Sequence, residues 1–119
     1  MTDDLYLKDL NQYYCTTNHY VHPLFRSIKY TDGVQYLMSN GYSWFVTDAM
    51  AVLVAGPRRV RMEPFLVIKL NLRENKPAQM TMDDGNGKIV YRQNYGYTEA
   101  KVELKIYFEN RVLMLPSER

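Results

Sequence analysis

Cysteine is nearly absent from this sequence of 119 residues, in which Cys15 is the single example. One thiol cannot form an intramolecular disulfide, and it cannot supply a zinc site built from several cysteines. Stability must therefore come from an apolar core. The lack of disulfides also favours a reducing compartment, and we expect the protein to be cytoplasmic.

Long apolar runs are missing as well. The longest run, Ala49–Ala55, is far shorter than the ~20 residues that a helix needs to cross a bilayer. The first ten residues, MTDDLYLKDL, are acidic and lack the basic and apolar regions of a secretory signal. We therefore expect neither export nor a membrane partner.

A strong excess of charge of one sign is also lacking, because 15 Lys and Arg face 13 Asp and Glu, for a net charge of +2. This value is too small to indicate a polyanionic partner, so nucleic acid remains a weakly supported alternative. The distribution is uneven, however. Residues 1–50 carry three cations against five anions, and residues 51–119 carry twelve against eight. Such a weak dipole can orient a partner.

The length and the hydrophobic fraction of 46% are those of one globular domain, which we assign to residues 1–119. Residues 1–56 form a predicted helical half. Capping residues followed by apolar residues three and four apart predict two to three helices there. The helix from Ser43 to about Val54 is apolar nearly all round, so we expect it to be the most buried. The expected helices cover residues 2–14, 31–40 and 43–54.

Residues 60–116 form the predicted sheet half, because beyond Pro64 apolar residues alternate with polar ones. Asp83–Gly87 is typical of a hairpin loop. We therefore predict an α+β domain with two to three N-terminal helices on one face of a four- to five-stranded antiparallel meander. The opposite face should contact water. Its expected residues are Lys69, Arg92, Glu103, Lys105 and Tyr107.

A candidate pocket falls within Thr16–Leu53, which holds both histidines and the only tryptophan. Two imidazoles and a carboxylate can bind a transition metal, and a histidine beside an acid can act as a general base. A lone H-x-x-H pattern without a third ligand at diagnostic spacing is weak support. We therefore assign no catalytic residue, metal or cofactor. The candidate pocket residues are His19, His22, Asp32, Trp44 and Asp48.

Two of these acids have structural alternatives. Asp32 can cap the second helix, as can Thr31, and this role is the favoured one. Asp48 lies within an apolar helix, where an unpaired carboxylate is costly. It should therefore pair with Arg26, Lys29 or the Trp44 indole, or else face a solvated cleft.

Two further features indicate a contact surface. The segment Gly56–Arg61 holds three arginines, which can bind phosphate or an acidic patch, although it can also be a plain solvated connection. It has no P-loop spacing, which excludes nucleotide binding of that type. The eleven tyrosines exceed what a small core can hide, and protein interfaces favour tyrosine. The predicted partner-binding residues are Arg58, Arg59, Arg61, Tyr95, Tyr97 and Tyr107.

Five sequence blocks resemble a small uncharacterised family, a domain of unknown function in bacterial, phage and mobile-element proteins. They are HYVHPLFR at 19–26, YTDGVQYL at 30–37, WFVTDA at 44–49, DDGNG at 83–87 and VLMLPSE at 112–118. The most specific are YTDGV and the W-x-x-x-D spacing, and together the blocks cover nearly the whole chain. The resemblance implies no catalytic residues. It implies a phage or mobile-element setting and a bacterial host cytoplasm, where small proteins often inhibit defence systems.

We therefore favour a non-enzymatic binding protein that contacts a protein partner, such as a CRISPR effector or another defence complex. One alternative is a small-molecule or nucleotide-binding or processing domain that uses the candidate pocket. Another is a self-associating structural protein with tyrosines at a homodimer interface.

Overall fold

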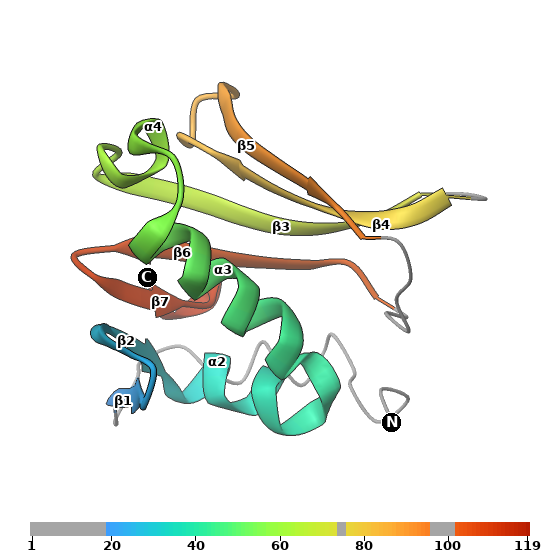
Figure 1. Cartoon of the computed structure of the whole chain (residues 1–119). Helices are drawn as coiled ribbons and strands as arrows, with labels where there is room; N and C mark the ends of the chain where they lie inside the picture. Colours follow the sequence, from blue (N-terminus) through green and yellow to red (C-terminus); the bar gives the residue numbers. More distant parts are fainter. Residues whose placement is uncertain (1–18, 74–75, 96–101) are drawn as a thin grey trace.

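The computed structural model describes residues 19–73, 76–95 and 102–119 (Figure 1). The predicted helix over 2–14 lies outside these residues, as do Cys15 and Tyr97. The strands are β1 His19–His22, β2 Phe25–Thr31, β3 Phe65–Arg73, β4 Lys76–Asp83, β5 Ile89–Asn94, β6 Leu104–Glu109 and β7 Val112–Met114. The helices are α2 Asp32–Leu37, α3 Ser43–Ala55 and α4 Arg58–Arg61, with shorter turns η1 Met38–Tyr42 and η2 Pro116–Glu118.

The strands of the described residues form one seven-stranded mixed sheet in the order β1-β2-β7-β6-β3-β4-β5. Every neighbouring pair is antiparallel except β2 and β7, which run parallel. The predicted four- to five-stranded antiparallel meander is therefore wrong, and so is the predicted set of two to three helices. Among the described residues α3 is the single long helix, since α2 and α4 have six and four residues.

The error lies in residues 19–31, which form the β1–β2 hairpin within the half predicted to be helical. Two buried apolar residues, Ile28 and Tyr30, give β2 its alternation, and this is too short a pattern to identify a strand. Its parallel partner β7 lies more than 80 positions away, since Lys29 pairs with Val112. No local pattern can indicate such a pairing.

The strands predicted beyond Pro64 lie where the alternation indicates, and the Asp83–Gly87 loop joins β4 to β5 as predicted. Gly85 and Gly87 adopt positive φ angles of 87° and 94°. The Asp83 and Asp84 carboxylates accept hydrogen bonds from the Gly85 and Asn86 backbone N–H groups, both at 2.8 Å. These contacts fix the tight turn between the strands.

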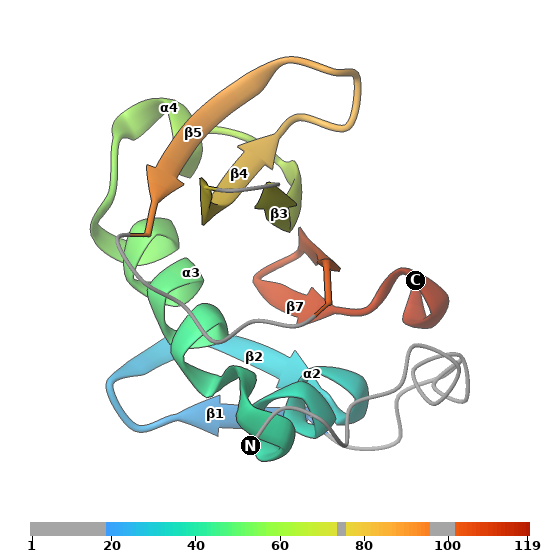
Figure 2. The same ribbon diagram turned by 90° about the vertical axis from the view of Figure 1, so that its right-hand side faces the viewer.

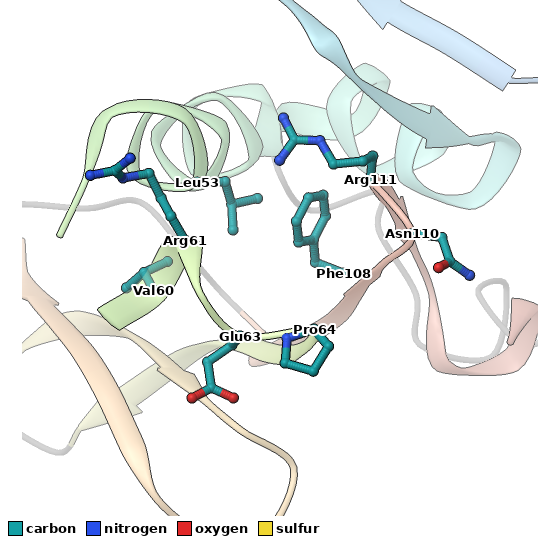
Figure 3. Close-up of a pocket in the computed structure, with 8 residues that line it drawn as sticks. All are labelled: Leu53, Val60, Arg61, Glu63, Pro64, Phe108, Asn110 and Arg111. Atoms are coloured by element: carbon teal, nitrogen blue, oxygen red, sulfur yellow. The ribbon is translucent and has the colours of Figure 1, made fainter. Parts of the chain in front are cut away.

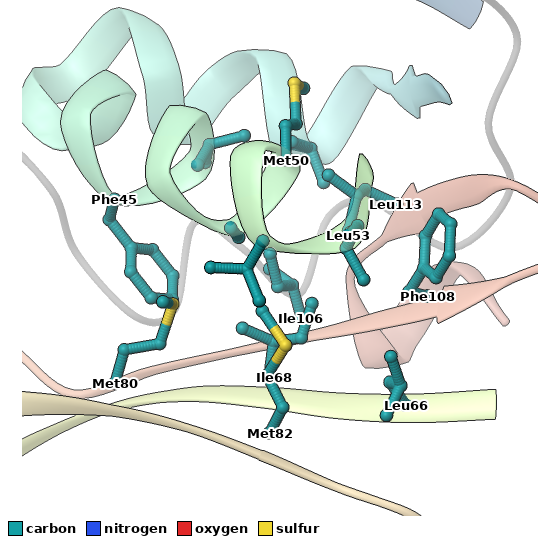
Figure 4. Packing of buried hydrophobic residues seen from close by; sticks show 14 of the residues in the cluster. Phe45, Met50, Leu53, Leu66, Ile68, Met80, Met82, Ile106, Phe108 and Leu113 are labelled. Atoms are coloured by element: carbon teal, nitrogen blue, oxygen red, sulfur yellow. The ribbon is translucent and has the colours of Figure 1, made fainter. Parts of the chain in front are cut away.

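The sheet curls around α3, which lies on its inner side (Figure 2). The predicted position of this helix and its deep burial are confirmed. Phe45, Ala49 and Met50 are fully buried, and the Phe45 side chain lies beside Met80 of the sheet (Figure 4). Burial of each large apolar side chain contributes about 1.5–3 kcal/mol. The main residues of the sheet in this core are Leu66, Ile68, Leu70, Met80, Met82, Leu104, Ile106 and Phe108.

The start of α2 and the end of the sequence are held together by one carboxylate, Glu118. Its Oε1 accepts hydrogen bonds from the Thr31 hydroxyl at 2.6 Å and from Leu115 N at 2.8 Å, and its Oε2 accepts one from Gly33 N at 3.0 Å. A Cβ at Gly33 would lie 2.5 Å from Leu115 Cδ1, so glycine permits the close approach. The blocks YTDGV and LPSE, far apart in the sequence, thus meet in space.

Among the described residues, no helix combines the length and the apolar character needed to cross a bilayer.

Candidate functional site

The two histidines of the candidate pocket do not converge. Both belong to β1, three positions apart, where alternation places them on opposite faces. His19 is exposed. His22 Nδ1 accepts a hydrogen bond from Leu24 N at 3.0 Å, and its ring packs against Phe25 with centroids 5.3 Å apart. His22 therefore stabilises the hairpin turn.

Asp32 also has a structural role, although it is not the helix cap. The cap of α2 is Thr31, whose hydroxyl accepts a hydrogen bond from Val34 N at 3.4 Å. The Asp32 carboxylate instead accepts one from the Tyr20 hydroxyl at 3.0 Å. This bond links α2 to β1, so Asp32 serves the packing of the hairpin against the helix.

Trp44 and Asp48 lie together on α3, and both face Tyr95, the residue that follows β5. The Trp44 and Tyr95 rings meet edge to face with centroids 5.2 Å apart. The Tyr95 hydroxyl is buried and has no hydrogen-bond partner among the described residues. Its burial, and then the charge of the neighbouring Asp48 carboxylate, raise the pKa of Tyr95 above its usual value of 10.0.

Asp48 therefore neighbours an aromatic hydroxyl, and in the part of the chain that the structure describes no ion pair joins it to Arg26 or Lys29. The five candidate pocket residues divide among three places: the β1–β2 hairpin, the start of α2 and the contact of α3 with Tyr95. Within residues 19–73, 76–95 and 102–119, no three His, Cys, Asp or Glu side chains lie close enough together to hold a metal ion.

The arginine-rich segment forms the short helix α4 rather than a loop. Arg59 Nε donates a hydrogen bond to the Val90 carbonyl oxygen at 2.6 Å, which attaches α4 to the edge strand β5. Arg61 Nε donates one to the Gly56 carbonyl oxygen at 3.1 Å. Arg58 is exposed and has no such bond among the described residues. Two of the three arginines thus have structural bonds.

The tyrosines predicted to bind a partner lie on different faces. Tyr95 packs against Trp44 on the inner side of the sheet, whereas Tyr107 is half-buried on the outer side. Tyr97 lies outside the described residues. The predicted partner-binding residues that the structure describes therefore do not form one surface. Among them, Tyr107 lies on the outer face of the sheet.

On that outer face, three cations stand in one line across four strands. Lys105 of β6 lies opposite Lys69 of β3. On the other side of β3, Lys69 lies opposite Thr81 of β4, and Thr81 in turn lies opposite Arg92 of β5. We call Lys105, Lys69 and Arg92 the basic row. Paired residues on neighbouring strands point to the same face, so the three side chains share one surface. Lys105 and Arg92 are exposed, and the Lys69 side chain is 41% exposed.

Only weak ionic compensation accompanies the basic row. Lys69 Nζ lies 4.0 Å from Asp83 Oδ2, and among the described residues Lys105 and Arg92 have no ion pair. Sequence alternation correctly predicts that all three side chains face water. It does not predict that they line up, because this alignment depends on the register of three strand pairs.

An aromatic cluster flanks the basic row on one side. The Phe65 and Tyr107 rings meet edge to face with centroids 5.2 Å apart, and the Arg119 guanidinium lies 4.3 Å from the Phe65 centroid. Arg119 Nε also donates a hydrogen bond to Glu109 Oε1 at 3.1 Å. On the other side of the row are amide side chains, joined by a 2.8 Å hydrogen bond from Gln79 Nε2 to Asn94 Oδ1.

Comparison with known proteins gives one match. A family model described as a family of unknown function (DUF6876) matches residues 4–119. No curated protein and no solved structure matches the chain. Since the matched residues include every described element and nearly the whole sequence, the chain belongs to DUF6876, a family of unknown function.

Proposed function

We propose that this chain is a non-enzymatic binding protein whose outer sheet face docks onto an acidic surface of a protein partner. The observation that supports this most is the basic row, in which Lys105, Lys69 and Arg92 share one exposed line across the sheet. The rival pocket hypothesis requires five side chains to converge, and they lie at three separate places.

The arrangement of the two lysines is the first argument. Lys69 and Lys105 lie directly opposite each other on adjacent strands, where like charges destabilise a sheet. Carboxylates from a partner would relieve this repulsion. Neighbouring strands lie about 4.8 Å apart, so the ammonium groups can bracket one carboxylate between them. Complementary charges of this kind also raise association rates and make them sensitive to salt.

The mixed character of the surrounding face favours a protein over a nucleic acid. The outer face also holds the Glu109 carboxylate, paired with Arg119, and the Asp83 carboxylate beside Lys69, so it lacks the continuous positive charge that a phosphate backbone needs. Half-buried Tyr107 adds an aromatic ring with a polar hydroxyl, the type of side chain that protein interfaces favour. The contact proposed is thus a small protein interface with cations near its centre.

We propose inhibition of a bacterial defence complex in the host cytoplasm as the setting for this contact. This part of the proposal depends on the resemblance of the sequence blocks to phage and mobile-element proteins. A CRISPR effector is one candidate partner, because such complexes can be blocked by a protein that occupies their surface.

The test is retention of a partner from a host lysate by the wild-type chain and by the variant Lys69→Glu/Lys105→Glu. Arg58→Glu/Arg59→Glu is the control with the same change of net charge, because it reverses two exposed cations on another surface, and Arg58→Glu alone tests a reversal that breaks no hydrogen bond of the described residues. We expect the row variant alone to lose the partner, by at least about tenfold in affinity, since charge reversal replaces attraction with repulsion. Lysine substitutions at acidic positions of the identified partner should then restore its binding to the row variant.

Three outcomes would contradict the proposal. Equal loss with Arg58→Glu/Arg59→Glu would indicate nonspecific charge attraction. If nuclease treatment abolishes retention of the partner, and an oligonucleotide binds the wild-type chain but not the row variant, the result would indicate a nucleic acid as the ligand. A dimer in light scattering that the row variant dissociates would favour self-association. A phage-survival assay with the same variants tests the defence setting separately.

A further inference from the structure

A small cavity opens where the end of α3 meets α4 and the β6–β7 turn (Figure 3). Its volume is about 250 Å³, which suits a small molecule rather than a drug-sized one. Phe108 lies on the inner face of β6, so the cavity is separate from the basic row on the outer face. The lining residues are Leu53, Val60, Arg61, Glu63, Pro64, Phe108, Asn110 and Arg111.

Arg111 has an unusual backbone in this cavity. It forms the β6–β7 turn with Asn110, and both have positive φ angles, of 65° and 56°. Asparagine tolerates this left-handed region, whereas arginine adopts it at a cost in free energy. Glycine would serve the turn better, so the turn alone does not explain an arginine at this position.

The Arg111 side chain is held in place. Its Nη2 donates a hydrogen bond to Ser27 Oγ at 2.8 Å, and its Nε donates a longer one to the Ser27 carbonyl oxygen at 3.4 Å. The guanidinium carbon lies 5.7 Å from the centroid of the Phe108 ring. In Figure 3 the guanidinium extends above Phe108 toward Leu53. An oriented guanidinium loses little entropy when it binds an oxyanion.

Arg61 forms part of the opposite wall of the cavity. Its Nε donates a hydrogen bond to the Gly56 carbonyl oxygen at 3.1 Å, which leaves the terminal nitrogens to bind elsewhere. In Figure 3, Leu53 lies between Arg61 and Arg111, and the Arg61 guanidinium extends away from both Leu53 and Arg111. The donors that remain available beside Leu53 and Phe108 are therefore the terminal N–H groups of Arg111, and Arg61 adds positive charge to the far wall.

The remaining lining limits what can enter. Leu53, Val60 and Phe108 are at least nine-tenths buried, so the floor offers a narrow apolar contact. Glu63 brings a carboxylate to the rim, where it would repel a second anionic group. The lining therefore suits one oxyanion attached to a small apolar body.

We propose that this cavity binds a small organic phosphate or carboxylate, with its oxyanion on the terminal N–H groups of Arg111 and its apolar part against Phe108 and Pro64. Guanidinium groups donate paired hydrogen bonds that match either oxyanion. The inference is independent of the proposed protein partner, because it uses the other side of the sheet.

The experiment is an NMR titration of the full chain with phenyl phosphate, benzoate and inorganic phosphate, following the arginine Nε–Hε signals. The variants are Arg111→Asn, which suits the left-handed backbone, and Arg61→Gln. Arg58→Gln is the control, since it removes an exposed cation on the same short helix as Arg61. Thermal unfolding of every variant confirms that it is folded.

We expect phenyl phosphate or benzoate to shift the Arg111 signal, and the probe that binds more tightly identifies the oxyanion. Arg111→Asn should weaken that binding by about tenfold or more, as expected for loss of a charge-assisted hydrogen bond, and Arg61→Gln, which removes a more distant charge, should weaken it less. Arg58→Gln should leave it unchanged. The proposal is refuted if no probe shifts the Arg111 signal at millimolar concentration. It is also refuted if inorganic phosphate binds as tightly as phenyl phosphate, or if Arg58→Gln weakens binding equally.

Discussion

Replacement of Glu118 by alanine should be among the most damaging single changes at a half-buried position of this fold. The carboxylate accepts three hydrogen bonds, from the Thr31 hydroxyl, Gly33 N and Leu115 N. A hydrogen bond to a charged group contributes about 1.5–3 kcal/mol, and solvent access at this half-exposed site reduces that value. The negative charge at the start of α2 adds about 0.3–1 kcal/mol.

We therefore expect Glu118→Ala to lower the free energy of unfolding by about 2–4 kcal/mol. For a domain of this size the midpoint of thermal unfolding should fall by about 8–16 °C. Urea unfolding followed by circular dichroism measures the first value, and a thermal scan measures the second. Glu118→Gln should lower the free energy of unfolding by about half as much, because an amide oxygen in the Oε1 position still accepts the hydrogen bonds from Thr31 and Leu115.

Glu109→Ala is the control, because Glu109 accepts an exposed bond from Arg119 and such pairs contribute at most about 1 kcal/mol. A double-mutant cycle with Thr31→Ala should give a coupling energy of about 1 kcal/mol or more. The reasoning fails if Glu118→Ala costs no more than Glu109→Ala. It also fails if the effects of Thr31→Ala and Glu118→Ala are simply additive.

Three further predictions concern single positions. Arg111→Gly should leave the free energy of unfolding unchanged or raise it by up to about 1 kcal/mol, because glycine suits the positive φ angle. If urea unfolding instead shows a clearly lower free energy of unfolding, the hydrogen bonds to Ser27 outweigh the backbone strain. Met80→Ala should lower the free energy of unfolding by about 2–5 kcal/mol, as it leaves a cavity beside Phe45, and a loss below 1 kcal/mol would contradict this packing. Asp48→Asn should lower the pKa of Tyr95 toward 10.0, measured by tyrosinate absorbance. Because the folded chain holds the Tyr95 proton more tightly than the unfolded chain, stability should fall as pH rises above about 10.

Much of the sheet could be predicted from the sequence, because alternation in Leu66–Leu72 and Val102–Phe108 is long enough to identify a strand. The helix from Ser43 was equally clear, since its nearly continuous apolar residues are a local signal. The β1–β2 hairpin was missed because β2 has two buried apolar positions and pairs with a strand far away in the sequence.

The candidate site was less predictable, for a related reason. Exposure of Lys69, Arg92 and Lys105 follows from alternation, but their alignment depends on strand register. The contact of Tyr95 with Asp48 and the position of Arg111 beside α3 also join segments that are distant in the sequence. Both histidines lie near acidic residues in the sequence. They belong to one strand, however, and its alternation directs the two histidine side chains to opposite faces.

The bond from Arg59 to Val90 has a consequence for how copies of this chain behave at high concentration. β5 is an edge strand, and the shift in its register with β4 leaves Val90 without a partner residue. An unpaired carbonyl at a sheet edge is a template on which a strand from another copy can add. Arg59 occupies that acceptor from within the same molecule and places a charge beside it. Arg59 thus blocks strand addition from another copy at this acceptor of the β5 edge.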